Sequence, residues 1–145
     1  MLITKEIEID MSHRVPNHNS KCKNLHGHRY KIEVGVDDKK ILDAGASDEG
    51  MVIDFSDLKA IMMEEIDAVY DHSHTMYEMD KYLSCLKPLI NDGLKVNVVS
   101  FIPTAENLAQ WWFVLVEKRL KERKIQIKHV KVWETPSSTA TYAIR

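Results

Sequence analysis

The sequence predicts an α+β fold, in which an antiparallel β-sheet carries its helices on one face. Apolar and polar residues alternate over 2–13 and 26–37 near the start of the chain and again over its last segment, 130–144, as they do in half-buried strands. Between these stretches, apolar residues recur at helical spacing over 58–70 and 108–120. Strands grouped at both ends, with the helices between them, favour an antiparallel sheet over a wound parallel one.

Length and composition limit both the architecture and the function. The 145 residues suit a single compact domain that spans 1–145. The net charge of −2 argues against a nucleic-acid-binding protein, which needs basic residues for phosphate contacts. The chain has only two cysteines, Cys22 and Cys85, so no disulfide framework is predicted and a reducing cytoplasm is expected. No apolar run is long enough to span a membrane.

The first predicted strand ends on an inward-facing histidine. Its even-numbered positions include three acidic residues, whereas its odd-numbered positions are mostly apolar. The apolar odd-numbered residues are Ile3, Ile7, Ile9 and Met11. His13 continues the odd-numbered set, so its imidazole is expected to face the core.

The second predicted strand begins with two more inward-facing histidines. His26 and His28 are two residues apart, so they point to the same face of a strand. The apolar residues that share this face are Tyr30, Ile32, Val34 and Val36. If the two strands pair as a hairpin, the end of the first lies beside the start of the second, and His13 joins His26 and His28.

Three inward imidazoles in one place predict a metal site, because a buried polar ring costs free energy unless it is bonded. Three histidine ligands without a fourth protein ligand are typical of a catalytic zinc ion with an open coordination position. Two alternatives remain open. The histidines could be satisfied core residues, or Cys22 could be the fourth ligand of a closed structural site.

The loop 14–25, between the two strands, is polar and basic. Arg14, Lys21 and Lys23 flank the histidines in the sequence. They form either an ordinary solvated loop or a patch that binds an anionic substrate.

The middle of the chain is predicted to be mainly helical. A turn region at 38–50 and a short apolar strand at 51–53 precede a capped helix that ends at Tyr70. A second, irregular helix is expected over 77–94, with Cys85 as a buried and inert thiol.

Asp71 and His72 stand at the predicted end of the first helix. A carboxylate beside an imidazole raises its basicity and can fix its orientation, so the two residues are a candidate acid–base pair. The alternative is a polar helix terminus without a chemical role. No role is assigned to His74.

Further candidates lie in the last third of the chain. A strand over 95–102 precedes a helix for which Thr104 is a natural N-cap, and Glu106 complements the dipole of that helix. Glu134 follows two inward-facing valines on the next strand. Its carboxylate is expected either to form a salt bridge with a lysine or to accept two N–H groups from a ligand.

Six motifs together resemble the family of 6-pyruvoyl-tetrahydropterin and 6-carboxytetrahydropterin synthases. They cover nearly the whole chain in the family's order. The motifs are Ser12-His13-Arg14, Cys22-x-x-x-His26-Gly27-His28, Gly50-Met51-Val52-Ile53-Asp54-Phe55, Asp71-His72, Pro103-Thr104-Ala105-Glu106-Asn107 and Glu134-Thr135. The resemblance implies the tunnelling fold (T-fold) and a homohexamer, a dimer of trimers whose active sites lie between subunits.

The resemblance also implies a role for each candidate. The zinc ligands would be His13, His26 and His28. Cys22 would accept a proton, with Asp71 and His72 as an assisting relay. The substrate would be 7,8-dihydroneopterin triphosphate. Its pterin ring would be anchored by Glu134 in a pocket lined by Thr104 and Glu106, and the candidates for its triphosphate are Arg14, Lys21 and Lys23.

Two reactions are implied by the resemblance. One branch eliminates triphosphate and yields 6-pyruvoyl-tetrahydropterin, whereas the other also releases acetaldehyde and yields 6-carboxytetrahydropterin on the way to queuosine. The compact cysteine loop and the stretch 101–107 resemble the second branch. The alternatives are a non-enzymatic, zinc-stabilised binding module and a zinc hydrolase whose nucleophile is water.

Overall fold

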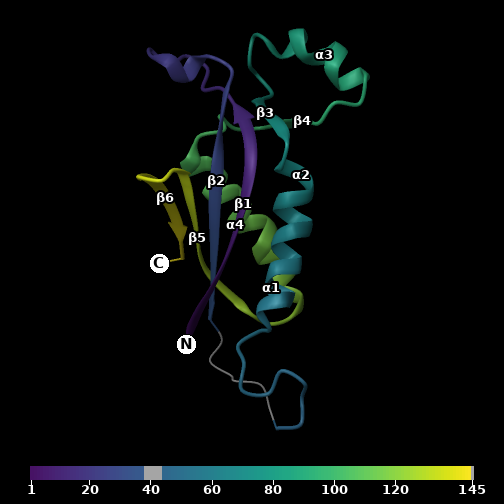
Figure 1. Ribbon diagram of the computed structural model, residues 1–145, viewed down its shortest axis with the longest axis vertical. Helices are drawn as coiled ribbons and strands as arrows, with labels where there is room; N and C mark the ends of the chain where they lie inside the picture. Colours follow the sequence, from purple (N-terminus) through teal and green to yellow (C-terminus); the bar gives the residue numbers. More distant parts are fainter. Residues whose placement is uncertain (38–43, 145) are drawn as a thin grey trace.

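The computed structural model describes residues 1–37 and 44–144, so part of the predicted turn region, 38–43, lies outside the described residues. Six strands form one sheet in the order β4-β3-β1-β2-β5-β6 (Figure 1). The strands are β1 (Leu2–His13), β2 (His26–Asp37), β3 (Ser73–Tyr77), β4 (Val96–Val99), β5 (Gln126–Thr135) and β6 (Ser138–Ala143). The helical segments are η1 (Lys21–Lys23), α1 (Phe55–Met62), η2 (Met63–Asp67), α2 (Ala68–Tyr70), α3 (Leu83–Asn91) and α4 (Ala105–Glu122).

The long hairpin of β1 and β2 is the centre of the sheet. The two strands pair antiparallel from Leu2 opposite Asp37 to His13 opposite His26. Strand β5 continues the antiparallel sheet beside β2, and β6 pairs antiparallel with β5. The predicted hairpin, its register and the two C-terminal strands are therefore confirmed.

One edge of the sheet differs from the predicted antiparallel arrangement. Strand β3 pairs parallel with the end of β1, and β4 pairs parallel with β3. The sheet is therefore mixed. Strand β3 has no alternating apolar pattern, which explains why its sequence did not predict a strand. The predicted strand at 51–53 is also wrong, because these residues form a bend in which Val52 and Ile53 are buried.

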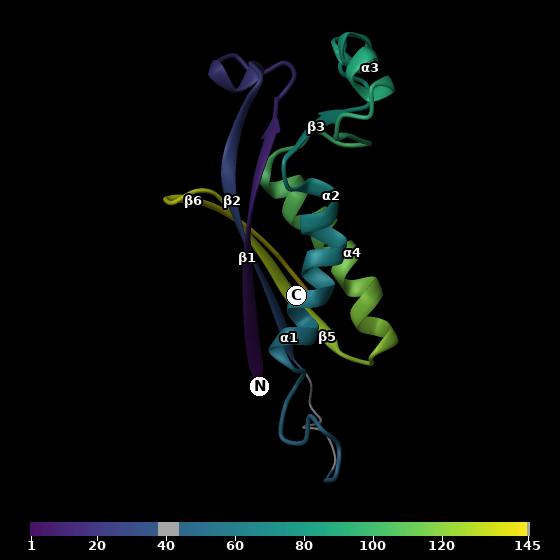
Figure 2. The ribbon, with the colours of Figure 1, turned by 45° about the vertical axis from the view of Figure 1, so that its right-hand side comes forward.

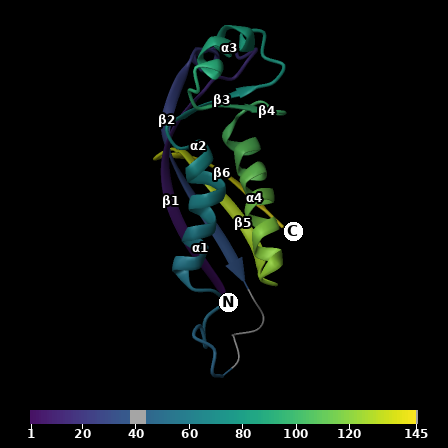
Figure 3. The ribbon, with the colours of Figure 1, turned by 90° about the vertical axis from the view of Figure 1, so that its right-hand side faces the viewer.

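The helices α1, α2 and α4 cover one face of the sheet, as predicted (Figures 2 and 3). A π-helical turn, η2, joins α1 to α2, so the predicted helix up to Tyr70 is continuous. The core lies between these helices and the hairpin, with Tyr30 and Trp112 fully buried. The other face of the sheet, here called the open face, carries charged side chains such as Glu8, Arg29 and Lys31 in cross-strand pairs.

Helix α3 lies outside this core, at the end of the molecule where the hairpin loop is (Figure 1). None of its residues is buried. Cys85 is exposed, so the prediction of a buried thiol is wrong. The spacing of leucines along α3 indicates a helix but does not determine whether that helix packs on the core. None of the described helices is long and apolar enough to cross a membrane.

Candidate metal centre

The three predicted histidines meet at the end of the hairpin. His13 is paired with His26, and His28 lies opposite Met11, so all three rings lie on the helix-covered side. The ring centroids are 4.7 to 5.3 Å apart. One nitrogen of each ring lies within 4.8 Å of the others, close enough for all three to bind one metal ion.

Gly27, between two of the histidines, allows this close approach. A Cβ atom at this position would lie 2.9 Å from the carbonyl oxygen of Met11 on the neighbouring strand. A larger residue would therefore push β1 and β2 apart at the point where their histidines meet.

Backbone carbonyls fix the orientation of two of the rings. The Nδ1 of His13 is 2.6 Å from the carbonyl oxygen of Pro103, and the Nδ1 of His26 is 2.8 Å from the carbonyl oxygen of Asn24. A carbonyl oxygen only accepts hydrogen bonds, so each Nδ1 carries the proton. Both rings therefore keep Nε2 as a free base, the arrangement that proteins use to orient metal-binding histidines.

The third ring leaves a buried nitrogen without a partner. The Nε2 of His28 is buried and forms no hydrogen bond with the described residues, although Glu134 Oε1 lies 3.8 Å away. Burial lowers the pKa of His13 to about 4 and also lowers the pKa of His28, so both rings are neutral at neutral pH. The neutral imidazoles and the unpaired nitrogen fit a metal ion such as zinc, and they do not fit three satisfied core histidines.

Tyr30 is a further member of the site that the sequence predicted only as a core residue. Its hydroxyl lies 3.3 Å from Nδ1 and 3.2 Å from Nε2 of His13. Its ring contacts His28 on one side and Trp112 on the other. Burial raises the pKa of Tyr30, and the charges of Glu134 and Cys22 raise it further.

Cys22 lies on the η1 turn and is half-buried. The loop is held by a hydrogen bond from the amide of Val15 to the carbonyl of Cys22, 2.9 Å long. The group of ligand atoms within 4.8 Å of one another contains the three histidines and not Cys22. This arrangement favours a three-histidine site with an open position over the closed site in which Cys22 is a ligand.

Glu134 borders a cleft next to the metal site. The cleft has a volume of about 460 Å³ and is also lined by His28, Lys31 and Trp133. The ammonium group of Lys31 lies 3.8 Å from the centre of the Trp133 ring. The cleft thus places a carboxylate acceptor beside an indole ring that is covered by an ammonium group, and the carboxylate suits a ligand with N–H donors.

The predicted acid–base pair is formed, but it lies on another side of the hairpin. Asp71 Oδ2 is 2.7 Å from Nδ1 of His72, and Asp71 Oδ1 accepts a hydrogen bond from the backbone N–H of Asp10. That N–H and the contact with His72 lower the pKa of Asp71. His72 is exposed beside Asp10 and Arg29 on the open face, in a cleft whose wall includes His28. Among the described residues, the pair forms no hydrogen bond or ion pair with the three histidines.

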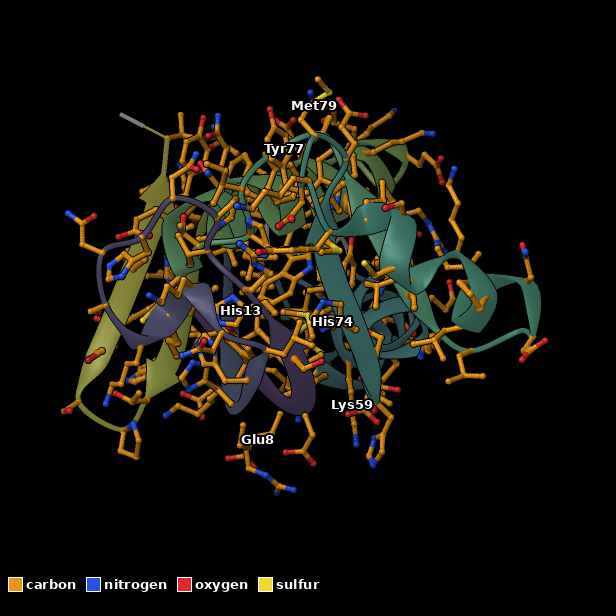
Figure 4. All side chains as sticks on the ribbon, turned by 90° about the horizontal axis from the view of Figure 1, so that it is seen from above. Glu8, His13, Lys59, His74, Tyr77 and Met79 are labelled. Atoms are coloured by element: carbon orange, nitrogen blue, oxygen red, sulfur yellow. The ribbon has the colours of Figure 1, made fainter. Side chains whose placement is uncertain are left out.

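A second buried polar cluster lies beside the metal site and was not predicted. Arg14 is paired with Asp80 at 3.3 Å, and Ser12 Oγ is 2.7 Å from Nδ1 of His74. Viewed from above, His13 and His74 lie together near the centre of the molecule (Figure 4). Arg14 Nε, His74 Nε2 and Asp80 Oδ2 are buried without a partner among the described residues. The cluster ties the loop after β1 to the segment after β3.

Removing the charge of Asp80 is expected to destabilise the fold. The side chains of Arg14 and Asp80 are 7% and 0% exposed, so Asp80→Asn leaves a buried guanidinium without a counter-charge. We expect the free energy of unfolding to fall by about 3 to 5 kcal/mol in urea titrations. The control is Asp57→Asn, which breaks the exposed pair of Asp57 with Arg123 and should cost at most about 1 kcal/mol. Equal effects of the two substitutions would contradict this account.

The remaining candidates occupy the rims of the site. Lys21 and Lys23 are exposed on the η1 turn, and Lys23 borders a cleft of about 510 Å³ together with Arg14. Thr104 is the N-cap of α4, as predicted, because its side chain accepts a hydrogen bond from the amide of Asn107. Glu106 is exposed in the first turn of that helix. The roles of these residues in substrate binding stay predictions.

Comparisons with known proteins agree with the geometry. A family model described as 6-pyruvoyl tetrahydropterin synthase matches residues 2–144. The chain is 37% identical over 142 residues to 6-carboxy-5,6,7,8-tetrahydropterin synthase of Haemophilus influenzae, covering 97% of this chain and 96% of that protein. It is 33% identical to the protein of the same name in Aquifex aeolicus, with the same two coverages.

Two solved structures share the fold. An uncharacterised protein from Wolinella succinogenes superimposes with a TM-score of 0.85 at 24% identity, covering 100% of this chain and 98% of that one. The 6-pyruvoyl tetrahydropterin synthase of Caenorhabditis elegans superimposes with a TM-score of 0.69 at 22% identity, covering 100% and 96% of the two chains. The match with the second structure confirms the predicted T-fold.

Proposed function

Because the chain belongs to the 6-pyruvoyl tetrahydropterin synthase family, we propose that it is a zinc-dependent lyase acting on 7,8-dihydroneopterin triphosphate. The products are 6-carboxy-5,6,7,8-tetrahydropterin, acetaldehyde and triphosphate, with one water consumed. The observation that carries the proposal is the unpaired, buried Nε2 of His28, set between two oriented histidines and 3.8 Å from Glu134. A metal site and an acceptor for a ring N–H are thus adjacent.

The residues of the site suit the removal of a carbon-bound proton. Zinc held by His13, His26 and His28 would act as a Lewis acid toward the hydroxyl oxygens of the substrate side chain. Cys22, half-buried on the loop above the histidines, accepts the proton as a thiolate. Glu134 accepts the 2-amino and ring N–H groups of the pterin and thereby fixes the reacting carbon near the thiolate.

The relatives favour the branch that releases acetaldehyde. The proteins from Haemophilus influenzae and Aquifex aeolicus are both named 6-carboxy-5,6,7,8-tetrahydropterin synthase. That reaction supports a place in queuosine biosynthesis. The alternative is a 6-pyruvoyl-tetrahydropterin synthase, which eliminates triphosphate and leaves the side chain intact, since the family model carries that name.

A second copy of the chain is part of the proposal. Asp71 and His72 lie apart from the three histidines within one chain, and His72 is exposed. An exposed acid–base pair on one subunit can complete the site of another, so we propose a homohexamer, a dimer of trimers with sites between subunits. The exposed Lys21 and Lys23 would bind the triphosphate, together with Arg14, which borders the same cleft as Lys23. The cytoplasmic location also stays a prediction.

Product analysis tests the proposal. The zinc-loaded protein is incubated with 7,8-dihydroneopterin triphosphate, and the products are identified by mass, with acetaldehyde trapped as a hydrazone. We expect 6-carboxytetrahydropterin and acetaldehyde in equal amounts. 6-Pyruvoyl-tetrahydropterin without acetaldehyde would support the alternative branch. Unchanged substrate would overturn the lyase and favour a binding module, and release of phosphate from an intact side chain would favour a hydrolase.

A further inference from the structure

The hydroxyl of Tyr30 is buried at the metal site with a single neighbour for hydrogen bonding. Tyr30 is 0% exposed. Among the described residues, the hydrogen-bonding contacts of its hydroxyl are with the two ring nitrogens of His13, at 3.3 and 3.2 Å. The packing of its ring against Trp112 and His28 holds the hydroxyl in this position.

Neither of the two nitrogens is a well-placed acceptor for the proton of this hydroxyl. The Nδ1 of His13 already donates to the carbonyl oxygen of Pro103, 2.6 Å away, so it has no lone pair to offer. The hydroxyl is almost equally far from both nitrogens, so it lies well off the direction of the Nε2 lone pair, which points outward from the ring. That lone pair stays available to a metal ion, because Nδ1 carries the proton and donates to Pro103.

The buried hydroxyl of Tyr30 therefore has no well-directed acceptor among the described residues. A buried phenol donor without an acceptor costs free energy unless an acceptor enters the site. Neither Glu134 nor Cys22 is hydrogen-bonded to Tyr30, although the charges of both act on it. The acceptor therefore comes from outside the chain, at the open side of the three histidines.

We propose that, in the metal-loaded protein, the hydroxyl of Tyr30 donates a hydrogen bond to the side-chain oxygen of the substrate on which negative charge develops when Cys22 removes the proton. This role rests on the proposed function. The phenol remains protonated and transfers no proton in this step. It is a donor held in place before the reaction, of the kind that stabilises developing oxyanions in enzymes.

The substitution Tyr30→Phe tests this role, because it removes the hydroxyl and keeps the ring. Zinc affinity is measured by competition with a chromophoric chelator, and turnover with 7,8-dihydroneopterin triphosphate. We expect zinc to bind as tightly as in the wild type, because the hydroxyl does not occupy the lone pair that His13 would give to the metal. We expect kcat to fall about a hundredfold, because a donor to the developing charge is missing.

The matched control is Tyr70→Phe. Tyr70 is also buried, but its hydroxyl accepts a hydrogen bond from Nε1 of Trp111, away from the histidines. Its zinc affinity and kcat should be those of the wild type. A Tyr30→Phe variant with unchanged kcat, or with weaker zinc binding, would overturn the role of Tyr30 alone. Absence of turnover in the wild type would overturn the proposed function and this role with it.

Discussion

Replacing Cys22 by alanine is expected to lower turnover of 7,8-dihydroneopterin triphosphate about a thousandfold, the usual contribution of a positioned general base. The thiol lies on the η1 turn, just before His26 in the chain, and is not among the ligand atoms that can share a metal. Zinc content and thermal stability should therefore stay at wild-type values. Turnover is measured by product mass and zinc by elemental analysis.

The second cysteine provides the control. Cys85 is exposed on α3, which lies outside the core, so Cys85→Ala should retain full activity. If Cys22→Ala were also fully active, the proton would be taken by another group, and a zinc hydrolase would become the better description. If Cys22→Ala lost its zinc, Cys22 would be a metal ligand and the open site would be wrong.

Mixing two inactive variants is expected to restore activity. His72 is exposed and lies apart from the three histidines in its own chain, so a site between subunits takes Cys22 from one chain and His72 from another. The variants Cys22→Ala and His72→Ala should each be nearly inactive. After dissociation and reassembly of an equal mixture, about a quarter of the sites contain two intact contributors, so about a quarter of wild-type activity should return.

The same mixing experiment has a direct control. A mixture of Cys22→Ala with His26→Ala should also be tested, because both residues belong to the same half of the site. Each reassembled site takes both residues from one chain, and every chain lacks one of them, so this mixture should stay inactive although His72 is intact throughout. Recovery in neither mixture would indicate that His72 acts within its own chain, and a fully active His72→Ala variant would indicate that it takes no part.

The hairpin and the metal site could be predicted because they depend on local alternation. The odd-numbered residues of β1 and the even-numbered residues of β2 form the inward face of the hairpin. The pairing of the two strands follows from that pattern, and it places His13 opposite His26. A period of two is a property of consecutive residues, so the sequence alone is sufficient. The N-cap of α4 at Thr104 is equally local.

Contacts between distant parts of the chain could not be predicted in this way. The carbonyl of Pro103 that orients His13 lies 90 residues along the chain, and the Asp80 that pairs with Arg14 lies 66 residues along it. Strand β3 is added to the sheet by pairing with the end of β1, although its own residues do not alternate. Such partners depend on how the elements pack, which local spacing does not encode.

Zinc titration of the metal-free protein tests the central claim most directly, because it separates a catalytic metal from a structural one. Apolar side chains make up the core between the helices and the sheet, and two of the three histidines, His26 and His28, are only partly buried at its end. We therefore expect the metal-free protein to remain folded by circular dichroism but to lack turnover, and zinc to restore turnover with an end point of one ion per chain. Unfolding on metal removal would identify a zinc-stabilised module, and full turnover without metal would contradict the assignment of His13, His26 and His28 as the ligands of a catalytic zinc.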